Sequence, residues 1–555
     1  MVRAFCPVVV LILLCSPIVQ AAIDVRTEGG HTIVTCPAGG EATARLVLRA
    51  DPDRPLIAEI AIDGTPVLVD VDPALVLTVG TRNLADKAGW VAFFDNPLRR
   101  PFQAHRAKLV RKAPKVSRHG ERMTITVADV AAGPFTGDLR FTVYPDTRLI
   151  RMDVVVSTKQ DACAILYDVG LVAAEPTWKQ VAWVSNADDE WRRSGPNAGP
   201  SEIAVRHRAV LAETDAGAVA VFPPPHQYLY PLDFADNFRF AWHGRGWRDL
   251  VDESGFGVRQ TIEGDKRYVP WVNAPPDTEQ RLGVFLLATR GDATKTLDEV
   301  RRFTRSDRLK KLPGHVTFSS HYHVEHTLDL DGRKAKQIPQ DLVEPGFVKT
   351  FKSHGLDIVH LAEFHVHHTD EITARRLELL KLMHDECARL SDDDFLLLPG
   401  EEPNVHLGGH WISFFPKPVY WTLQRGKDQP FVEEMAGYGK VYHVGSAADV
   451  LTLMEAEGGL MWTAHPRIKG SFGFPDAYRQ TDFFKSDRFL GAAWKAMPAD
   501  YSRPRLGERV LDLLDDMNNW GAAKHVIGEV DVFKVNPDSE LYGHLNVNYL
   551  KLGRT

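Results

Sequence analysis

The sequence contains little cysteine, with five residues in a chain of 555. Two of the five fall within the first 22 residues, so only Cys36, Cys163 and Cys387 remain for the rest of the chain. An odd number of widely spaced thiols does not favour a disulfide framework. We expect three buried thiols, with a single bridge as the alternative.

The chain also lacks a basic tract and a long apolar run. Its 66 Lys and Arg against 73 Asp and Glu give a net charge of -7, and no basic cluster is interleaved with aromatic residues. Nucleic-acid-binding proteins carry such a basic patch, so we expect no nucleic-acid partner. The apolar run at residues 8–14 is far too short to cross a bilayer, and we expect no membrane span.

The N-terminus has the pattern of a secretory signal peptide. Arg3 precedes the apolar run, Pro17 interrupts the segment, and the small residues Ala21 and Ala22 provide a cleavage site. We therefore predict a signal peptide over residues 1–22 and a secreted or periplasmic mature protein.

Residues 23–304 consist of short alternating runs separated by turn-forming residues. Examples are residues 56–62, 123–127 and 149–156. Alternation buries one face of a strand and leaves the other in water, so this part is predicted to be an all-β sandwich. Residues 139–152 resemble strands of the galactose-mutarotase-like β-supersandwich found in carbohydrate-active enzymes.

Tryptophan and tyrosine gather between Trp178 and Trp271. Their flat faces could stack on sugar rings, but the core of a β-sandwich also uses aromatic residues heavily. Core packing is the favoured interpretation, and a carbohydrate platform that includes Trp242 and Trp247 is the alternative.

The hydrophobic period changes after residue 304. A helix is expected at residues 292–302, and the charged segment 305–314, which ends in Pro313 and Gly314, is predicted to be a linker. Residues 315–555 then alternate short apolar runs with helical stretches such as residues 372–390. This alternation predicts a multidomain protein whose C-terminal domain is an α/β barrel of parallel strands.

Histidine and carboxylate residues stand at the ends of these predicted strands. His321 and His323 are two residues apart, so on one strand they face the same side and could bind one cation. Further candidate ligands follow other predicted strands: Glu402, His410, His465 and Asp531.

In this order the motifs resemble the PHP (polymerase and histidinol phosphatase) superfamily of metal-dependent hydrolases. The match comprises H-x-H at His321, P-G-x-E ending at Glu402, G-H at His410, A-H-P at His465, and the segment 528–533 around Asp531. The resemblance implies a distorted (β/α)7 barrel in residues 315–555.

Two histidines of the family pattern are phenylalanine here, Phe364 and Phe533, and both belong to the family's third metal site. The resemblance then implies one or two divalent transition metals, Zn, Mn or Fe. One ion would take His321, His323, Glu402 and Asp531, and the other would take Glu402, His410 and His465.

The resemblance also assigns candidate catalytic roles. Glu363 would serve as a base or support a metal ligand from behind, His365 could replace the lost histidine, and Arg467 could hold an anionic group. Metal-activated water would hydrolyse a phosphoester or a carboxylic or carbamic ester of a small molecule or a saccharide. The alternative is a carbohydrate-binding surface protein with an inactive metal-binding barrel.

Overall fold

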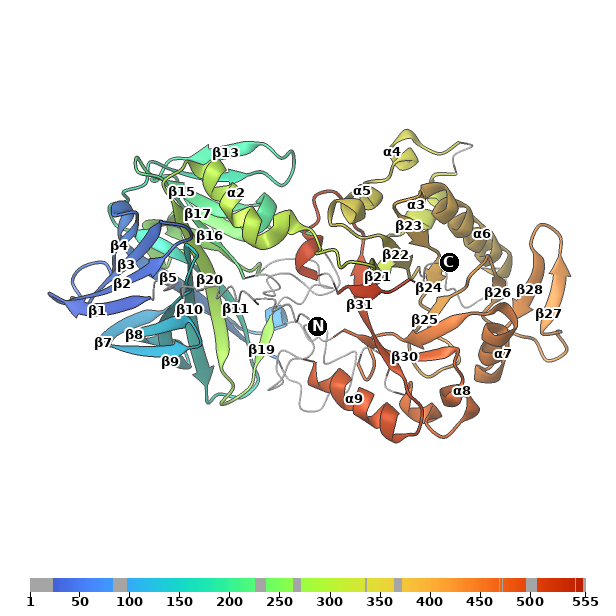
Figure 1. Cartoon of the computed structure of the whole chain (residues 1–555). Coiled ribbons are helices and arrows are strands. Elements are labelled where there is room, and N and C mark those ends of the chain that lie inside the picture. Colours follow the sequence, from blue (N-terminus) through green and yellow to red (C-terminus); the bar gives the residue numbers. More distant parts are fainter. Residues whose placement is uncertain are drawn as a thin grey trace, which may run out of the picture.

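The structure is a computed structural model of the whole chain, shown in Figure 1. It describes residues 23–82, 97–224, 236–262, 271–334, 337–363, 372–468, 470–471, 473–495, 507–544 and 546–552. The predicted signal peptide lies outside the described residues. No helix among the described residues is long and apolar enough to cross a membrane.

Two antiparallel sheets form the N-terminal part of the chain (Figure 1). The first has the order β1 (Asp24–Glu28), β2 (His31–Pro37), β3 (Thr43–Arg49), β4 (Ile57–Ile62), β5 (Thr65–Thr81), β11 (Cys163–Ala173), β18 (Val251–Val258), β17 (Ala241–Trp247) and β14 (Ser201–Ile203), with β6 (Gln103–Arg106) and β19 (Val272–Ala274) attached. The second has the order β13 (Trp191–Ser194), β12 (Gln180–Val184), β15 (Val210–Glu213), β16 (Ala218–Phe222), β20 (Gln280–Thr289), β10 (Leu149–Thr158), β9 (Phe135–Val143), β8 (Arg122–Ala132) and β7 (Lys108–His119).

The core of this sandwich follows from the alternation in its strands. In β2, for example, Val34 and Cys36 are buried, whereas the alternate residues Ile33 and Thr35 are half-buried. Every residue of β11 is buried, because this strand lies in the middle of its sheet. The all-β prediction for this part agrees with the structure. The three cysteines are free and buried, as expected, and burial raises the pKa of Cys36 to about 11.

Most of the tryptophans of the sandwich belong to its interior. Trp178, Trp242, Trp247 and Trp271 are all buried, and the rings of Trp242 and Trp247 stack with centroids 5.0 Å apart. Core packing therefore describes them, and neither Trp242 nor Trp247 forms an exposed platform. Trp191, on β13, is only half-buried.

One helix covers the sandwich and leads out of it (Figure 1). α2 (Ala293–Thr304) begins at Asp292, whose side chain accepts a hydrogen bond from the backbone N–H of Lys295. Leu297 and Val300 face β15, β16 and β20. The short helix η3 (Arg305–Asp307) follows at once, inside the segment predicted to be a linker.

The C-terminal part is built on a curved mixed sheet. Its order is β23 (Leu396–Leu398), β22 (Ile358–Leu361), β21 (Val316–His323), β31 (His525–Phe533), β30 (Phe489–Trp494), β29 (Leu460–Thr463), β25 (Trp411–Phe414) and β24 (Gly400–Glu401), and β32 (Asn548–Leu550) pairs with β21. A separate small sheet has the order β26 (Tyr420–Thr422), β28 (Gly439–His443) and β27 (Val432–Met435).

The helices of this part are α3 (His326–Arg333), α4 (Gln340–Val343), α5 (Gly346–Ser353), α6 (Ile372–Leu390), α7 (Ala447–Glu457), α8 (Asp482–Lys485) and α9 (Glu508–Asn519). Short 3-10 turns are η1 (Pro97–Arg99) and η2 (Arg206–Arg208) in the sandwich, and η4 (Asp476–Tyr478) and η5 (Leu541–His544) here.

The prediction of a (β/α)7 barrel is wrong. Such a barrel alternates parallel strands with helices, whereas β25 runs antiparallel to both β24 and β29. Antiparallel neighbours need only a short connection, and residues 402–410 join β24 to β25 without a helix. The small sheet of β26, β27 and β28 further interrupts the alternation. Parallel pairing remains among β21, β22, β23, β29, β30 and β31.

The stacked tryptophans give a test of the sandwich core. We expect Trp242→Ala to lower the free energy of unfolding by about 3 kcal/mol or more, because removing a buried ring leaves a cavity. Chemical denaturation of the mature chain measures this. The control is Val110→Ala, since Val110 is 65% exposed and should change little. Equal stability of Trp242→Ala and the wild type would show that Trp242 is not a core residue.

Candidate metal centre

The end of β21 presents two histidines with an irregular backbone. His321 has φ 80°, and the pairing of β21 with both β22 and β31 shifts register between Ser320 and Tyr322. A bulge of this kind re-aims side chains. As a result the rings of His321 and His323 lie 4.9 Å apart, both buried.

Two further candidate ligands also have positive φ. Asp531, near the end of β31, has φ 57°, and His465, just after β29, has φ 26°. Residues other than glycine adopt this region at a cost, and they concentrate at functional sites. The backbone at these three strand ends therefore has an unfavourable conformation that orients the candidate ligand side chains.

Glu402 lies at the centre of the cluster and its two oxygens face different partners. Oε2 is 3.1 Å from Nε2 of His321 and 3.4 Å from Nε2 of His323. Oδ1 of Asp531 completes this group at 3.6 and 3.5 Å from the same nitrogens. Oε1 is 3.0 Å from Nδ1 of His410 and 2.9 Å from Nε2 of His465. One carboxylate thus joins two groups of ligand-type atoms.

These distances fit a shared ion. Ligand atoms about 2.0–2.1 Å from one tetrahedral cation lie about 3.4 Å from one another. The contacts among His321, His323, Glu402 and Asp531 range from 3.1 to 3.6 Å. The structure therefore brings together all six side chains predicted from the sequence, four of them with the spacing expected around one ion, while His410 and His465 lie closer to Glu402, at 3.0 and 2.9 Å.

The local charge also fits a cation. Glu402, Glu529 and Asp531 are buried carboxylates, and among the described residues the buried ammonium of Lys495 bonds to Asp531. Buried charge is costly unless it is paired. Burial alone would raise the pKa of Glu402, but the charges of His321 and His410 hold it well below its ordinary value. Burial lowers the pKa of His321, yet Glu402, Glu529 and Asp531 raise it well above its usual value.

Two residues of the site were missed in the sequence. Glu529 Oε2 lies 3.0 Å from Nδ1 of His321, and its Oε1 accepts the backbone N–H of His465 at 2.8 Å. Lys495 follows β30 and reaches Asp531 Oδ2. A charged residue that ends an apolar strand run, as Lys495 does, or that interrupts one, as Glu529 does, is the signal that could have identified them.

The structure shows which partners two of the predicted catalytic residues, Glu363 and Arg467, contact. Glu363 is buried, and its Oε1 accepts the backbone N–H of Glu325 at 3.1 Å. Arg467 binds two carboxylates, with Nη2 2.7 Å from Asp476 and 2.7 Å from Asp516. His365 and Phe364 lie outside the described residues. Phe533 stacks on His323 with ring centroids 4.3 Å apart.

A buried histidine beside the cluster belongs to the core. His360 contacts Ser320 Oγ at 2.9 Å and the carbonyl oxygen of Ser413 at 3.1 Å. Burial lowers its pKa to about 3, so the ring is neutral at pH 7. It is a hydrogen-bonded core residue of β22.

Comparisons with known proteins show no family for this chain. No family model matches it, and no curated protein matches it. A GH36 α-galactosidase, AgaA, from Geobacillus stearothermophilus is 9% identical with a TM-score of 0.28, and the match covers 94% of this chain and 74% of that one. A galactose mutarotase related enzyme from Lactobacillus acidophilus is 11% identical with a TM-score of 0.25, covering 46% and 97%. An α-mannosidase from Enterococcus faecalis is 8% identical with a TM-score of 0.26, covering 52% and 32%.

The assignment to the PHP superfamily is corrected by these findings. The C-terminal sheet is not a (β/α)7 barrel, because β25 runs antiparallel to both of its neighbours, and no family model matches the chain. The resemblance to that family therefore no longer supports zinc or manganese as the metal. With TM-scores of 0.28 or below, these likenesses carry no argument about activity, and the candidate site rests on its own side chains.

His360 makes stability depend on pH. Its pKa is about 3 when folded and about 6.5 when unfolded, so the unfolded chain takes up a proton first as the pH falls. We expect this group to remove about 2 kcal/mol of unfolding free energy between pH 7 and pH 5. In His360→Gln that decline should be smaller by this amount. Denaturation at both pH values measures it, with the half-buried His406→Gln as control; identical declines in wild type and His360→Gln would contradict the assignment.

Proposed function

We propose that the chain is a metal-dependent hydrolase that cleaves an ester bond of a small molecule or a saccharide. The observation that carries the proposal is the buried Glu402 carboxylate, whose two oxygens face two groups of histidines. Mixed imidazole and carboxylate sets suit divalent transition metals. A cation bound there would lower the pKa of a coordinated water toward neutrality and so provide hydroxide near pH 7.

The candidate ligands differ in how far they are exposed to solvent. The side chains of His321, His323 and Glu402 are 0–1% exposed, whereas that of His410 is 18% exposed. Substrate therefore approaches from the side of His410. Ser471 Oγ accepts the backbone N–H of His410 at 3.0 Å and fixes this residue. A Cβ on Gly409 would meet the Cα of Ser471 at 2.6 Å, so glycine permits that close approach.

The remaining polar groups hold the ligands in position. A carboxylate behind a ligating histidine fixes its tautomer, and Glu529 stands in that place behind His321. Lys495 binds one oxygen of Asp531 and leaves Oδ1 toward the histidines. Arg467, the predicted anion holder, is already paired with the carboxylates of Asp476 and Asp516. This arrangement favours an uncharged carboxylic or carbamic ester over a phosphate ester.

Metal content tests the centre. We expect the mature chain, purified without chelator, to hold about one or two transition-metal ions, as read by mass spectrometry of the digested protein. Glu402→Ala should lose most of this metal, because both groups share that carboxylate. His406→Ala is the matched control, since His406 lies four residues from His410 but binds the carbonyl oxygen of Leu423. A wild type free of metal would overturn the proposal.

Ester hydrolysis tests the activity. We expect the metal-loaded chain to hydrolyse 4-nitrophenyl acetate faster than 4-nitrophenyl phosphate. His321→Ala should reduce the rate at least about 100-fold, since even changes behind a ligand cost 10–100-fold, while His406→Ala should retain it. Metal binding without turnover on either ester would instead favour a carbohydrate-binding protein.

A further inference from the structure

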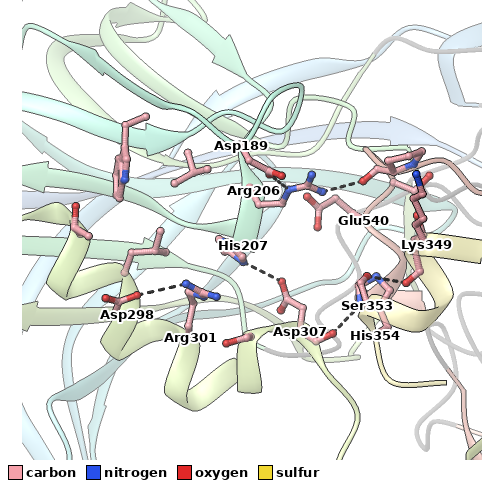
Figure 2. Close-up of a pocket in the computed structure, with 18 residues that line it drawn as sticks. Asp189, Arg206, His207, Asp298, Arg301, Asp307, Lys349, Ser353, His354 and Glu540 are labelled. Atoms are coloured by element: carbon pink, nitrogen blue, oxygen red, sulfur yellow. Dashed lines mark hydrogen bonds and ion pairs between the residues drawn. The ribbon is translucent and has the colours of Figure 1, made fainter. Parts of the chain in front are cut away.

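A cavity of about 580 Å³ lies between the sandwich and the C-terminal part (Figure 2). Its walls come from the sandwich, from α2 and η3, from α5, and from the loop that follows β31. Ligand sites occur preferentially at such interfaces and have volumes of about 300–1,000 Å³. None of the six candidate metal ligands lines this cavity, so it is a separate site.

Hydrogen bonds between the two parts hold the walls in place. Arg206 Nη1 donates to the carbonyl oxygen of Pro537 at 2.9 Å, and His354 Nδ1 lies 2.6 Å from the carbonyl oxygen of Asp307. Beside the cavity, Asn237 Nδ2 donates to Oε1 of the buried Glu540 at 2.9 Å. The cavity is therefore a built feature of the interface.

Left-handed backbone surrounds this site. His207, Arg208, Arg305, Ser306 and Asp307 all have φ between 53° and 59°. Such conformations in residues other than glycine persist where the surrounding structure imposes them, often at ligand sites. The turn at η2 and the turn at η3 both contribute them, and they bring Arg208 onto Asp307.

Several of the charges that line the cavity are paired within it, while Lys349 pairs at 3.3 Å with Glu344, which does not line the cavity. Arg206 Nε binds Asp189 at 2.6 Å, and Arg301 Nη1 lies 3.4 Å from Asp298, as Figure 2 shows in part. Burial raises the pKa of Glu540 to about 8, so this carboxyl is mostly neutral at pH 7. The paired arginine and aspartate side chains still have further N–H groups and carboxylate lone pairs that can bond to a ligand. This lining suits hydroxyl groups, which donate and accept together, better than a strongly charged ligand.

One wall of the cavity is apolar. The half-buried indole of Trp191 lies there with Val184 and Leu297. The guanidinium of Arg193 covers one face of this ring, 5.5 Å from its centroid, so a ligand can meet only the rest of the indole. The face of an indole ring accepts the C–H groups of a sugar ring, and aromatic rings of this kind are frequent in binding sites with one wet side. Among the tryptophans of the sandwich, Trp191 therefore has the placement that the buried Trp242 and Trp247 lack.

We propose that this interface cavity binds a neutral saccharide of one or two sugar units. Trp191 supplies the surface against which a ring stacks. The Asp189–Arg206 and Asp298–Arg301 pairs supply paired donors and acceptors for its hydroxyl groups. The site is independent of the metal centre, so it adds a binding function to the proposed hydrolase and does not rest on it.

Ligand binding to the full mature chain tests the proposal. The probes are lactose, maltose and cellobiose, compared with the charged galacturonic acid and glucose 6-phosphate, by saturation-transfer NMR and calorimetry. We expect at least one neutral disaccharide to bind, and Trp191→Ala to weaken it about tenfold. The Asp298→Asn/Arg301→Gln double variant should weaken it as well, and it tests the site without a core change, because these side chains are 63% and 39% exposed.

Two variants act as controls. Arg192→Ala changes an exposed neighbour of Trp191 that does not line the cavity, and Glu402→Gln disables the metal centre; both should bind the disaccharide as the wild type does. The proposal is overturned if no neutral disaccharide binds, if only the charged sugars bind, or if Trp191→Ala and the double variant both bind normally. Binding that is lost in Glu402→Gln alone places the sugar at the metal centre and also overturns it.

Discussion

The buried carboxylate of Glu402 is the constraint on which the C-terminal part depends. A carboxylate removed from water is costly unless charges or hydrogen bonds compensate it. Here compensation comes from four imidazoles, carried by β21 and by the segments beside β25 and β29. The strand ends must therefore converge on one point, and the parallel pairing of β21, β31, β30 and β29 brings them there. The pairing of the strands therefore also determines the geometry of the candidate site.

This convergence is achieved against local backbone preference. His321, His465 and Asp531 all adopt positive φ, which a regular strand would not impose. The cost is offset by the surrounding sheet, in which Tyr322, directly after His321, and Val532, directly after Asp531, are fully buried. In the same strands, apolar side chains thus anchor the strand in the core, and the polar side chains between them point toward the site.

Local patterns in the sequence predict some levels of this structure well and others poorly. Alternation in segments such as β2 predicts the sandwich strands, and a histidine pair such as His321 and His323 predicts a common direction, because both depend on neighbours in sequence. The structure brings the six candidate ligands together. Strand direction is a long-range property, however, and nothing near Trp411 indicates that β25 runs antiparallel. Partner choice is equally hidden: Arg467 binds Asp476 and Asp516, while Lys495 and Glu529 complete the cluster.

The sandwich supports the candidate metal centre through the loop that leaves β31. Lys534, just past Asp531 and Phe533, donates its backbone N–H to the carbonyl oxygen of His323 at 2.9 Å. Three residues later the carbonyl oxygen of Pro537 accepts Arg206 of the sandwich at 2.9 Å. The strand end that carries Asp531 is therefore fixed on both sides within a few residues. A strained strand end keeps its geometry only where such contacts over-determine it, so the two parts of the chain form one support for the site.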